Sequence, residues 1–176
     1  EVIRDAEGLT YKKKMITIME IMGRNAGWLT GAAALAKTED CEGPDLIYLP
    51  EIPFDVEKFL AKVKDLLTKK DSVVIAVSEG IKLADGRYVC ELGSSSDYVD
   101  NFGDKQLQRT AAYLANFLAG ECGCKTRAVE FSTLQRSASH MASRTDIDEA
   151  FMVGGAAVKA ADEGDTGKMV VIDRVS

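Results

Sequence analysis

Apolar and polar positions along the chain follow two alternating periods. Short runs rich in β-branched residues, such as MITIMEI, are typical of buried strands, whereas apolar residues at every third or fourth position are typical of helices. The short runs predict strands over 15–21, 45–51, 72–79, 127–131 and 168–175. The longer periods predict helices over 26–38, 55–70, 104–120 and 146–163. Strands and helices that alternate at this spacing indicate an α/β fold, a three-layer sandwich around a mainly parallel sheet.

Local signals mark the ends of several predicted elements. Asp55 is placed to cap the second helix, and Asp85-Gly86 lies between two extended segments, which indicates a hairpin turn. Asp104 and Gly120 mark the expected start and end of the third helix.

The overall composition is that of an ordinary globular protein of one or two domains. The chain carries 22 basic and 28 acidic side chains, a net charge of −6, so it has no basic excess to neutralise nucleic-acid phosphates. No apolar run reaches the roughly 18 residues of a membrane helix. We therefore expect neither nucleic acid nor a membrane as a partner.

The cysteines indicate the cellular compartment of the protein, and the chain ends indicate whether the sequence is part of a longer one. Four cysteines are scattered without the spacing of a structural metal site: Cys41, Cys90, Cys122 and Cys124. This pattern favours reduced thiols in a cytoplasmic protein. The chain opens at Glu1 without an initiating methionine and closes in a predicted strand, so we expect it to be a fragment of something longer.

Residues that directly follow the predicted strands are the candidates for chemistry, because ligands of open α/β sheets bind outside the carboxyl ends of the strands. They are Met22, Gly23, Arg24, Asn25 and Gly27, then Ser78, Glu79 and Gly80, and finally Ser132, Thr133, Leu134, Gln135 and Arg136. One edge of the sheet would thus carry two arginines, a carboxylate and backbone amides that glycine leaves accessible. Such a set suits a phosphorylated polyol as ligand. Arginine can bind phosphate through two hydrogen bonds, and a carboxylate accepts hydrogen bonds from sugar hydroxyls.

Each candidate also has an ordinary structural explanation. Gly23 could serve only a tight turn, Arg24 could be a surface side chain, and Glu79 could be a solvated carboxylate or the partner of an arginine. His140, the only histidine, lies in a polar loop, and we expect a structural or surface role for it. The chain has no Gly-x-Ser-x-Gly elbow, which disfavours a hydrolase, and no Gly-x-Gly-x-x-Gly after a strand, which argues against a dinucleotide-binding domain.

Five segments, in this order and with compatible spacing, resemble the phosphofructokinases: EIMGRNAGWLTGAAALA, VVIAVSEGI, DNFGDKQLQ, KTRAVEF and LQRSASHMASRTD. The resemblance covers essentially the whole chain and implies half of a phosphofructokinase-like fold. It implies that residues 1–136 form the small domain, which binds fructose 6-phosphate. Residues 137–176 then form a helix–strand segment that in the family returns to the donor-binding domain, and that we expect to pack on the same core here.

The resemblance also assigns roles to single residues. Met22, Gly23 and Arg24 match the family's Met-Gly-Arg contact with fructose 6-phosphate, and Glu79 matches the glutamate that binds the sugar hydroxyls. Arg127 resembles an arginine that reaches the 6-phosphate in a neighbouring subunit. A homo-oligomer is therefore expected.

The phosphate contacts contain departures from the family pattern. Arg136 resembles a further phosphate ligand, but many relatives have a histidine three residues before it, where this chain has Thr133. A threonine hydroxyl can donate a hydrogen bond but carries no charge, so we expect phosphate to be bound more weakly or in a different arrangement. Met15 aligns with an arginine of the ATP-dependent members, and Asp104 stands where relatives often carry histidine.

The family's donor-binding glycine loop and its Thr-Ile-Asp-Asn-Asp segment, which supplies the catalytic base, belong to the half that precedes this chain. We therefore expect no catalytic residue, no metal ligand and no catalysis from the chain alone, with Mg²⁺ bound through the missing half. MGRNAGW and LQRSASHMAS resemble the pyrophosphate-using, clostridial-type branch, which favours pyrophosphate over ATP as donor. The parent enzyme is then expected to phosphorylate fructose 6-phosphate to fructose 1,6-bisphosphate in glycolysis.

Two alternatives stay open at this point. The parent could be an ATP-dependent phosphofructokinase, or the chain could be a non-catalytic regulatory module that binds a phosphosugar at the same edge. Exposed apolar strand edges would favour self-association in either case.

Overall fold

The computed structural model describes residues 1–8, 13–93, 110–173 and 175. Contacts within the chain divide it into two units, Glu1–Gln135 and Arg136–Ser176, which are described separately below. None of the helices in the described ranges is both long enough and apolar enough to cross a membrane.

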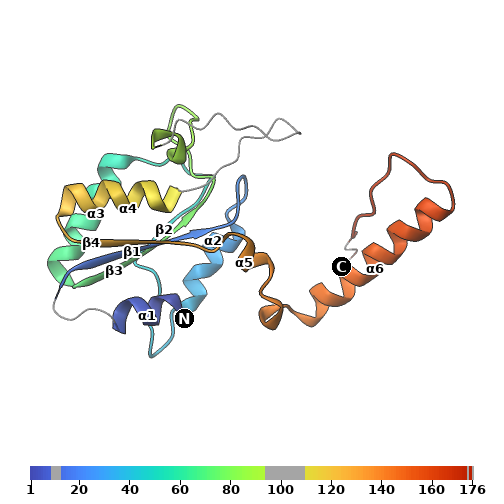
Figure 1. The fold of residues 1–176 in the computed structure, drawn as a ribbon, viewed down its shortest axis with the longest axis horizontal. Coiled ribbons are helices and arrows are strands. Elements are labelled where there is room, and N and C mark those ends of the chain that lie inside the picture. Colours follow the sequence, from blue (N-terminus) through green and yellow to red (C-terminus); the bar gives the residue numbers. More distant parts are fainter. Residues whose placement is uncertain (9–12, 94–109, 174, 176) are drawn as a thin grey trace. The chain divides into compact units, whose positions relative to one another are not determined.

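A parallel sheet of four strands, in the order β2-β3-β1-β4, forms the centre of the first unit (Figure 1). Its strands are β1 (Met15–Ile21), β2 (Leu46–Tyr48), β3 (Ser72–Ser78) and β4 (Lys125–Glu130). β1 pairs in register with both β3 and β4, so that Met15 lies beside Ser72 and beside Lys125. The strands therefore end together, and the segments that follow them leave from one edge of the sheet.

The two central strands are buried on both faces, as expected for apolar runs without polar alternation. Alternate residues enter different cores because successive side chains of a strand point to opposite faces. Ile16 and Ile18 of β1 belong to one apolar cluster, and Met15 and Met19 belong to the other. The sheet is thus the middle layer of three, which confirms the predicted α/β sandwich.

Helices cover both faces of the sheet. Figure 1 shows α3 (Val56–Lys69) and α4 (Thr110–Cys122) over one face and α1 (Val2–Gly8) over the other. In α3 the buried stripe contains Phe59, whose ring meets the Tyr48 ring edge-on at a centroid distance of 5.4 Å. A fully buried phenylalanine of this kind contributes about 1.5–3 kcal/mol of transfer free energy.

One predicted helix start is confirmed, and the extent of another predicted helix needs correction. The Asp55 side chain accepts a hydrogen bond from the Lys58 amide and caps α3 as predicted. The helix predicted over 26–38 is shorter: α2 (Trp28–Ala32) continues only as the 3₁₀ turn Ala33–Ala36, and it lacks a side-chain cap.

Gly120 does not end α4, which runs on to Cys122. The next glycine, Gly123, adopts the left-handed conformation (φ +61°) and donates its amide to the Ala119 carbonyl. The start predicted at Asp104 lies outside the described residues.

Three further differences concern short elements. The Asp85-Gly86 turn forms, with Gly86 at φ +88°, and the segments on either side of it form one isolated bridge, Lys82 with Tyr88, in place of two full strands; the Leu83 amide also donates to the Arg87 carbonyl at 2.8 Å. The predicted strand over 168–175 is wrong, since its described residues form no strand and a strand requires a partner to complete its hydrogen bonds. The helices α1 and α5 (Ser132–Arg136) carry no clear apolar period and were not predicted.

The second unit is built around α6 (Arg144–Asp162), somewhat longer than the predicted helix over 146–163. Its N-cap is Ser143, whose hydroxyl accepts the Asp146 amide at 3.0 Å. Several large apolar side chains of this unit remain exposed: Ile147, Phe151, Met152, Val158, Met169, Val171 and Ile172. None of the described residues of this unit is buried.

Candidate functional site

Three chain segments leave the sheet side by side where the strands end. The ladder continues past the strands, because Glu79 donates its amide to Ile21 at 3.1 Å and Phe131 donates its amide to Glu20 at 3.2 Å. Residues 22–24 after β1, residues 78–80 at the end of β3 and directly after it, and Gln135 of α5 are therefore neighbours. We call these residues the carboxyl edge.

Gly23 is the centre of the carboxyl edge. Its amide donates a hydrogen bond to Oε1 of Glu79 at 3.2 Å, and its carbonyl accepts one from the Ser78 hydroxyl. Its φ of +153° is one that residues with side chains rarely adopt, and an added Cβ would lie 2.6 Å from the Ala26 carbonyl oxygen. The position requires glycine, and the Glu79 carboxylate is held against this backbone.

Gly80 fixes the same corner from the other side. A Cβ at this position would overlap the carbonyl group of Arg24, so that only glycine allows the two backbone segments to approach. Gly80 is buried and Arg24 is half-buried. The loop that carries Arg24 is thus packed directly on the turn after β3.

Two other elements hold the loop after β1. The Met22 amide donates to Oε1 of Gln135 at 2.9 Å, which ties the loop to α5. The Gly27 amide donates to Oε1 of Glu51 at 2.6 Å, which ties the start of α2 to the segment after β2. Both acceptors are side chains from distant parts of the sequence.

A buried carboxyl lies directly beneath this edge. Glu20, the penultimate residue of β1, is only 7% exposed, and its Oε2 accepts the amide of Ala111 in α4 at 2.8 Å. Burial raises the pKa of Glu20 to about 7, and the negative charges of Glu130 and Glu79 act in the same direction against the hydrogen bond from Ala111. The neighbouring Thr110 hydroxyl donates to the Glu79 carbonyl at 3.0 Å.

The sequence-predicted residues fall into two groups. Met22, Gly23, Arg24 and Glu79 come together at the carboxyl edge. Arg127 does not join them: it pairs in register with Thr17, four residues before the end of β1. At about 3.3 Å per residue this is about 13 Å from the edge.

Arg127 has a partner of its own, because its guanidinium forms an ion pair with Asp5 of α1 at 3.1 Å. Thr133 is an exposed residue of α5. Arg136 ends α5 and begins the second unit, and its role stays a prediction.

Sequence reasoning missed the residues that position the site. Gln135, Ser78 and Gly80 were recognised only as neighbours of the strand ends, and Glu51 was not considered. The one available signal was position, since Gln135 directly precedes Arg136 in the motif LQR and Gly80 directly follows Glu79. Hydrogen bonds to backbone amides from distant side chains leave no pattern in a single sequence.

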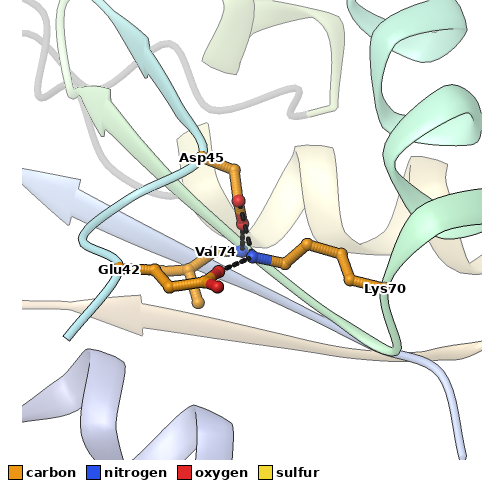
Figure 2. A network of polar contacts seen from close by, with 4 residues as sticks. All are labelled: Glu42, Asp45, Lys70 and Val74. Carbon is orange, nitrogen blue, oxygen red and sulfur yellow. Dashed lines mark hydrogen bonds and ion pairs between the residues drawn. The ribbon is translucent and has the colours of Figure 1, made fainter. Parts of the chain in front are cut away.

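A second polar network lies near the opposite ends of the strands. Figure 2 shows Lys70 between two carboxylates, with Nζ at 2.7 Å from both Glu42 and Asp45, while Asp45 also accepts the Val74 amide at 2.8 Å. We call these four residues the amino edge. Burial lowers the pKa of Lys70, but the hydrogen bonds to Asp45 and Glu42 outweigh it and hold the pKa above its usual value.

The amino edge borders a polar cavity of about 850 Å³, whose lining includes Asp40, Cys41 and Ser72. Its lysine and carboxylates satisfy one another, so the network itself is structural. All four cysteines are free thiols, as the sequence predicted. Across the described ranges no three His, Cys, Asp or Glu side chains are grouped so as to hold a metal ion, and His140 is exposed in a short 3₁₀ turn.

Comparison with known proteins identifies the family of the chain. A family model described as phosphofructokinase matches residues 2–161. Pyrophosphate–fructose 6-phosphate 1-phosphotransferases of Xanthomonas campestris pv. campestris and Halomonas elongata are 40% and 36% identical over 176 residues, covering 100% of this chain and 41% of each relative.

A solved structure shows the same likeness. The crystal structure of a pyrophosphate-dependent phosphofructokinase from Nitrosospira multiformis matches with a TM-score of 0.67 and 33% identity, over 99% of this chain and 40% of that one. The chain thus spans about two fifths of the length of these relatives. With a family match over nearly its whole length, the chain belongs to the phosphofructokinase family.

Proposed function

We propose that this chain is the sugar-phosphate-binding portion of a pyrophosphate-dependent phosphofructokinase, which transfers a phosphoryl group to the 1-hydroxyl of fructose 6-phosphate. The observation that carries the proposal is the Glu79 carboxylate, held at 3.2 Å by the Gly23 amide beside the loop of Arg24. Relatives that cover the whole chain carry this activity in their names, which supports the same substrate and donor.

The carboxyl edge offers the groups that a sugar phosphate needs. The Glu79 carboxylate has two acceptor oxygens, and with Oε1 oriented by Gly23 the other can accept hydrogen bonds from sugar hydroxyls. Arg24 supplies a permanent positive charge on the same loop, suited to an anionic ligand. The backbone is held in place before ligand arrives, which lowers the entropy lost on binding.

Three further residues extend the proposal to the phosphate. We assign Arg136 and the Thr133 hydroxyl to phosphate contacts within one copy of the chain. Arg127 would bind the 6-phosphate of a neighbouring copy in a homo-oligomer. Its ion pair with Asp5 is solvent-exposed, and exposed pairs contribute only about 0–1 kcal/mol, so a phosphate can displace it.

Catalysis is assigned to the remainder of the parent polypeptide. Phosphoryl transfer requires a positioned donor, Mg²⁺ and a base for the attacking hydroxyl. The described residues do not form a group that could hold a metal ion, and we assign the Mg²⁺ ligands to the remainder of the parent polypeptide. The chain alone then binds substrate without turning it over.

Binding is tested by titrating the ¹⁵N-labelled chain with fructose 6-phosphate up to about 10 mM, a range that detects millimolar affinity. We expect amide shift changes at residues 22–24 and 79–80, and at least tenfold weaker binding for Arg24→Ala and for Glu79→Gln. Arg87→Ala and Glu57→Gln remove the same groups at exposed positions elsewhere and should leave binding unchanged. Shift changes that avoid the carboxyl edge, or that survive both site variants, would contradict the proposal.

The absence of catalysis has its own test. The chain is incubated with fructose 6-phosphate, Mg²⁺ and either pyrophosphate or ATP, and fructose 1,6-bisphosphate is measured. We expect none. Product formation by the chain alone would show that the catalytic base lies within these residues.

A further inference from the structure

Glu20 is a buried carboxyl for which the proposed function has no use. It lies on β1 two residues before Met22, is 7% exposed, and points toward α4, where it accepts the Ala111 amide. A carboxyl in such a place is unusual, because acidic side chains are rarely buried unless they are paired with a cation. Here Glu20 is bound by the backbone amide of Ala111.

The contacts around Glu20 connect the start of α4 to both strands of the carboxyl edge. Ala111 is bound to the Glu20 side chain on β1, and the preceding residue, Thr110, is bound through its hydroxyl to the Glu79 carbonyl after β3. The Thr110 side chain also contacts the Cys90 thiol. One turn of α4 is thereby fastened to the two segments that present Gly23 and Glu79.

From these contacts we propose that Glu20 is a positioning residue for the carboxyl edge. Its charge state sets the geometry and the electrostatic potential at Gly23 and Glu79. This inference rests on the proposed function in so far as the edge binds a sugar phosphate. The placement of Glu20 itself does not depend on the ligand.

The titratable groups that face Glu20 come from three elements. Glu130 lies beside it on β4, Glu79 directly follows the neighbouring strand β3, and Cys90 lies in the 3₁₀ turn Val89–Leu92. Burial and the two carboxylates raise the pKa of Glu20 to about 7. Glu20 is therefore neutral in mildly acidic solution and becomes charged as the pH rises through neutrality.

The two states differ in what they do to a bound anion. Neutral Glu20 keeps the hydrogen bond to Ala111 without adding charge. Ionised Glu20 adds a negative charge within the low-dielectric core beside Glu79, which opposes an anionic sugar phosphate. Affinity for fructose 6-phosphate should fall by about threefold to tenfold across this ionisation, equivalent to a coupling of about half to one pKa unit.

The test compares the intact chain with Glu20→Gln, which keeps an acceptor oxygen but cannot ionise, and with Glu130→Gln as matched control, since Glu130 is the exposed residue in register with Glu20 on β4. Amide shifts of Gly23 and Glu79 are followed from pH 5.5 to 8.5. We expect a midpoint near 7 in the intact chain, a lower midpoint in Glu130→Gln because this variant removes one of the charges that raise the pKa of Glu20, and loss of the midpoint in Glu20→Gln. A carboxyl that is already ionised at pH 5.5 would produce no such midpoint.

Fructose 6-phosphate binding is then measured at pH 6 and pH 8 in all three chains. Glu20→Gln should lose the threefold to tenfold weakening at pH 8, and the ligand's own ionisation cancels because all variants share it. If no chain binds fructose 6-phosphate, the proposed function fails while the amide titration still decides the role of Glu20. Should Glu20→Gln not fold, the ¹³C-carboxyl titration of Glu20 in the intact chain replaces it. A midpoint below pH 5.5, or one that survives in Glu20→Gln, would overturn the inference.

Discussion

The two edges of the sheet hold their polar groups by different means. At the carboxyl edge, the side chains of Glu79 and Gln135 accept hydrogen bonds from the amides of Gly23 and Met22. At the amino edge, the oppositely charged side chains around Lys70 bind one another. In the first arrangement the half-buried Glu79 carboxylate is bound by the Gly23 amide and fixes the backbone, whereas the second satisfies its charges internally. The difference separates an edge suited to a ligand from one that stabilises the fold.

We expect the largest effect at Gly80, where two backbone segments of the carboxyl edge approach each other most closely. An added methyl group would overlap the Arg24 carbonyl, and backbone on both sides has little freedom to move. Gly80→Ala should therefore lower the free energy of unfolding by roughly 3 kcal/mol or more and abolish fructose 6-phosphate binding. Urea unfolding and ligand titration measure the two effects.

Gly120→Ala is the matched control, because Gly120 lies in α4 with open space around the added methyl group. Alanine in a helix is favoured over glycine by up to about 1 kcal/mol, so this variant should be as stable as the intact chain or more so. Equal effects of the two substitutions would show that the close approach of residues 24 and 80 is not required.

A pH-dependent effect is predicted at Glu20. Its pKa is about 7 in the fold against an ordinary value of 4.5, so between these values the folded chain retains a proton that the unfolded chain has lost. Stability from this group is therefore greatest in acid and falls as the pH rises from 4.5 to 7, in total by about 3 kcal/mol, and is level above 7.

Glu20→Gln should remove that dependence. The difference in unfolding free energy between Glu20→Gln and the intact chain should then favour the variant by about 3 kcal/mol more at pH 8 than at pH 4.5, as read from urea unfolding at a series of pH values. Glu130→Gln should keep the dependence but with a smaller fall, because it removes one of the charges that raise the pKa of Glu20. Parallel curves for Glu20→Gln and the intact chain would mean that Glu20 is already ionised in acid.

At the amino edge, Lys70→Met should lower stability by about 1–3 kcal/mol, because the mostly buried Asp45 carboxylate would lose its cation. Lys69→Met is the adjacent control, since Lys69 pairs with Asp65 on the exposed face of α3 and such pairs contribute only about 0.3–0.5 kcal/mol. Neither variant should change the affinity for fructose 6-phosphate. A loss of affinity in Lys70→Met would mean that the two edges are coupled.

The contrast between the edges also explains what the sequence could predict. The core strands were predictable because runs such as 73–77 are apolar at every position, and only a strand covered on both faces buries all of these side chains. Residues such as Gly23 and Glu79 were predictable as site candidates because they directly follow such strands. Their local sequence is sufficient to place them at the edge.

The remainder depends on contacts between distant residues, which no local pattern records. Gln135 binds Met22 across 113 positions and Glu20 binds Ala111 across 91. The end of α4 was misplaced because Gly120 and Gly123 are equally plausible as stops from sequence, and only the second adopts the left-handed conformation. Arg127 shows the same limit, since the motif identifies the residue but not that its side chain turns to Asp5.

The smallest predicted effect is at Ser132, where the third segment of the carboxyl edge begins. Across the described ranges Ser132 is the one non-glycine residue at positive φ, +45°, a left-handed conformation that costs about 1–2 kcal/mol for a residue with a side chain. Glycine would remove this strain, while its greater freedom in the unfolded chain would offset about 0.4–1 kcal/mol. Ser132→Gly should therefore raise stability by about 0.5 kcal/mol.

Ser137→Gly is the control, because Ser137 is an exposed serine without positive φ. This variant should lower stability by a similar amount, so the opposite signs form the test. The Met22 amide shift should be unchanged in Ser132→Gly, because Gln135 still accepts its hydrogen bond. If Ser132→Gly instead loses stability and shifts the Met22 amide, then the serine itself holds α5 in place, and the third segment is fixed by a side chain where the other two depend on glycine.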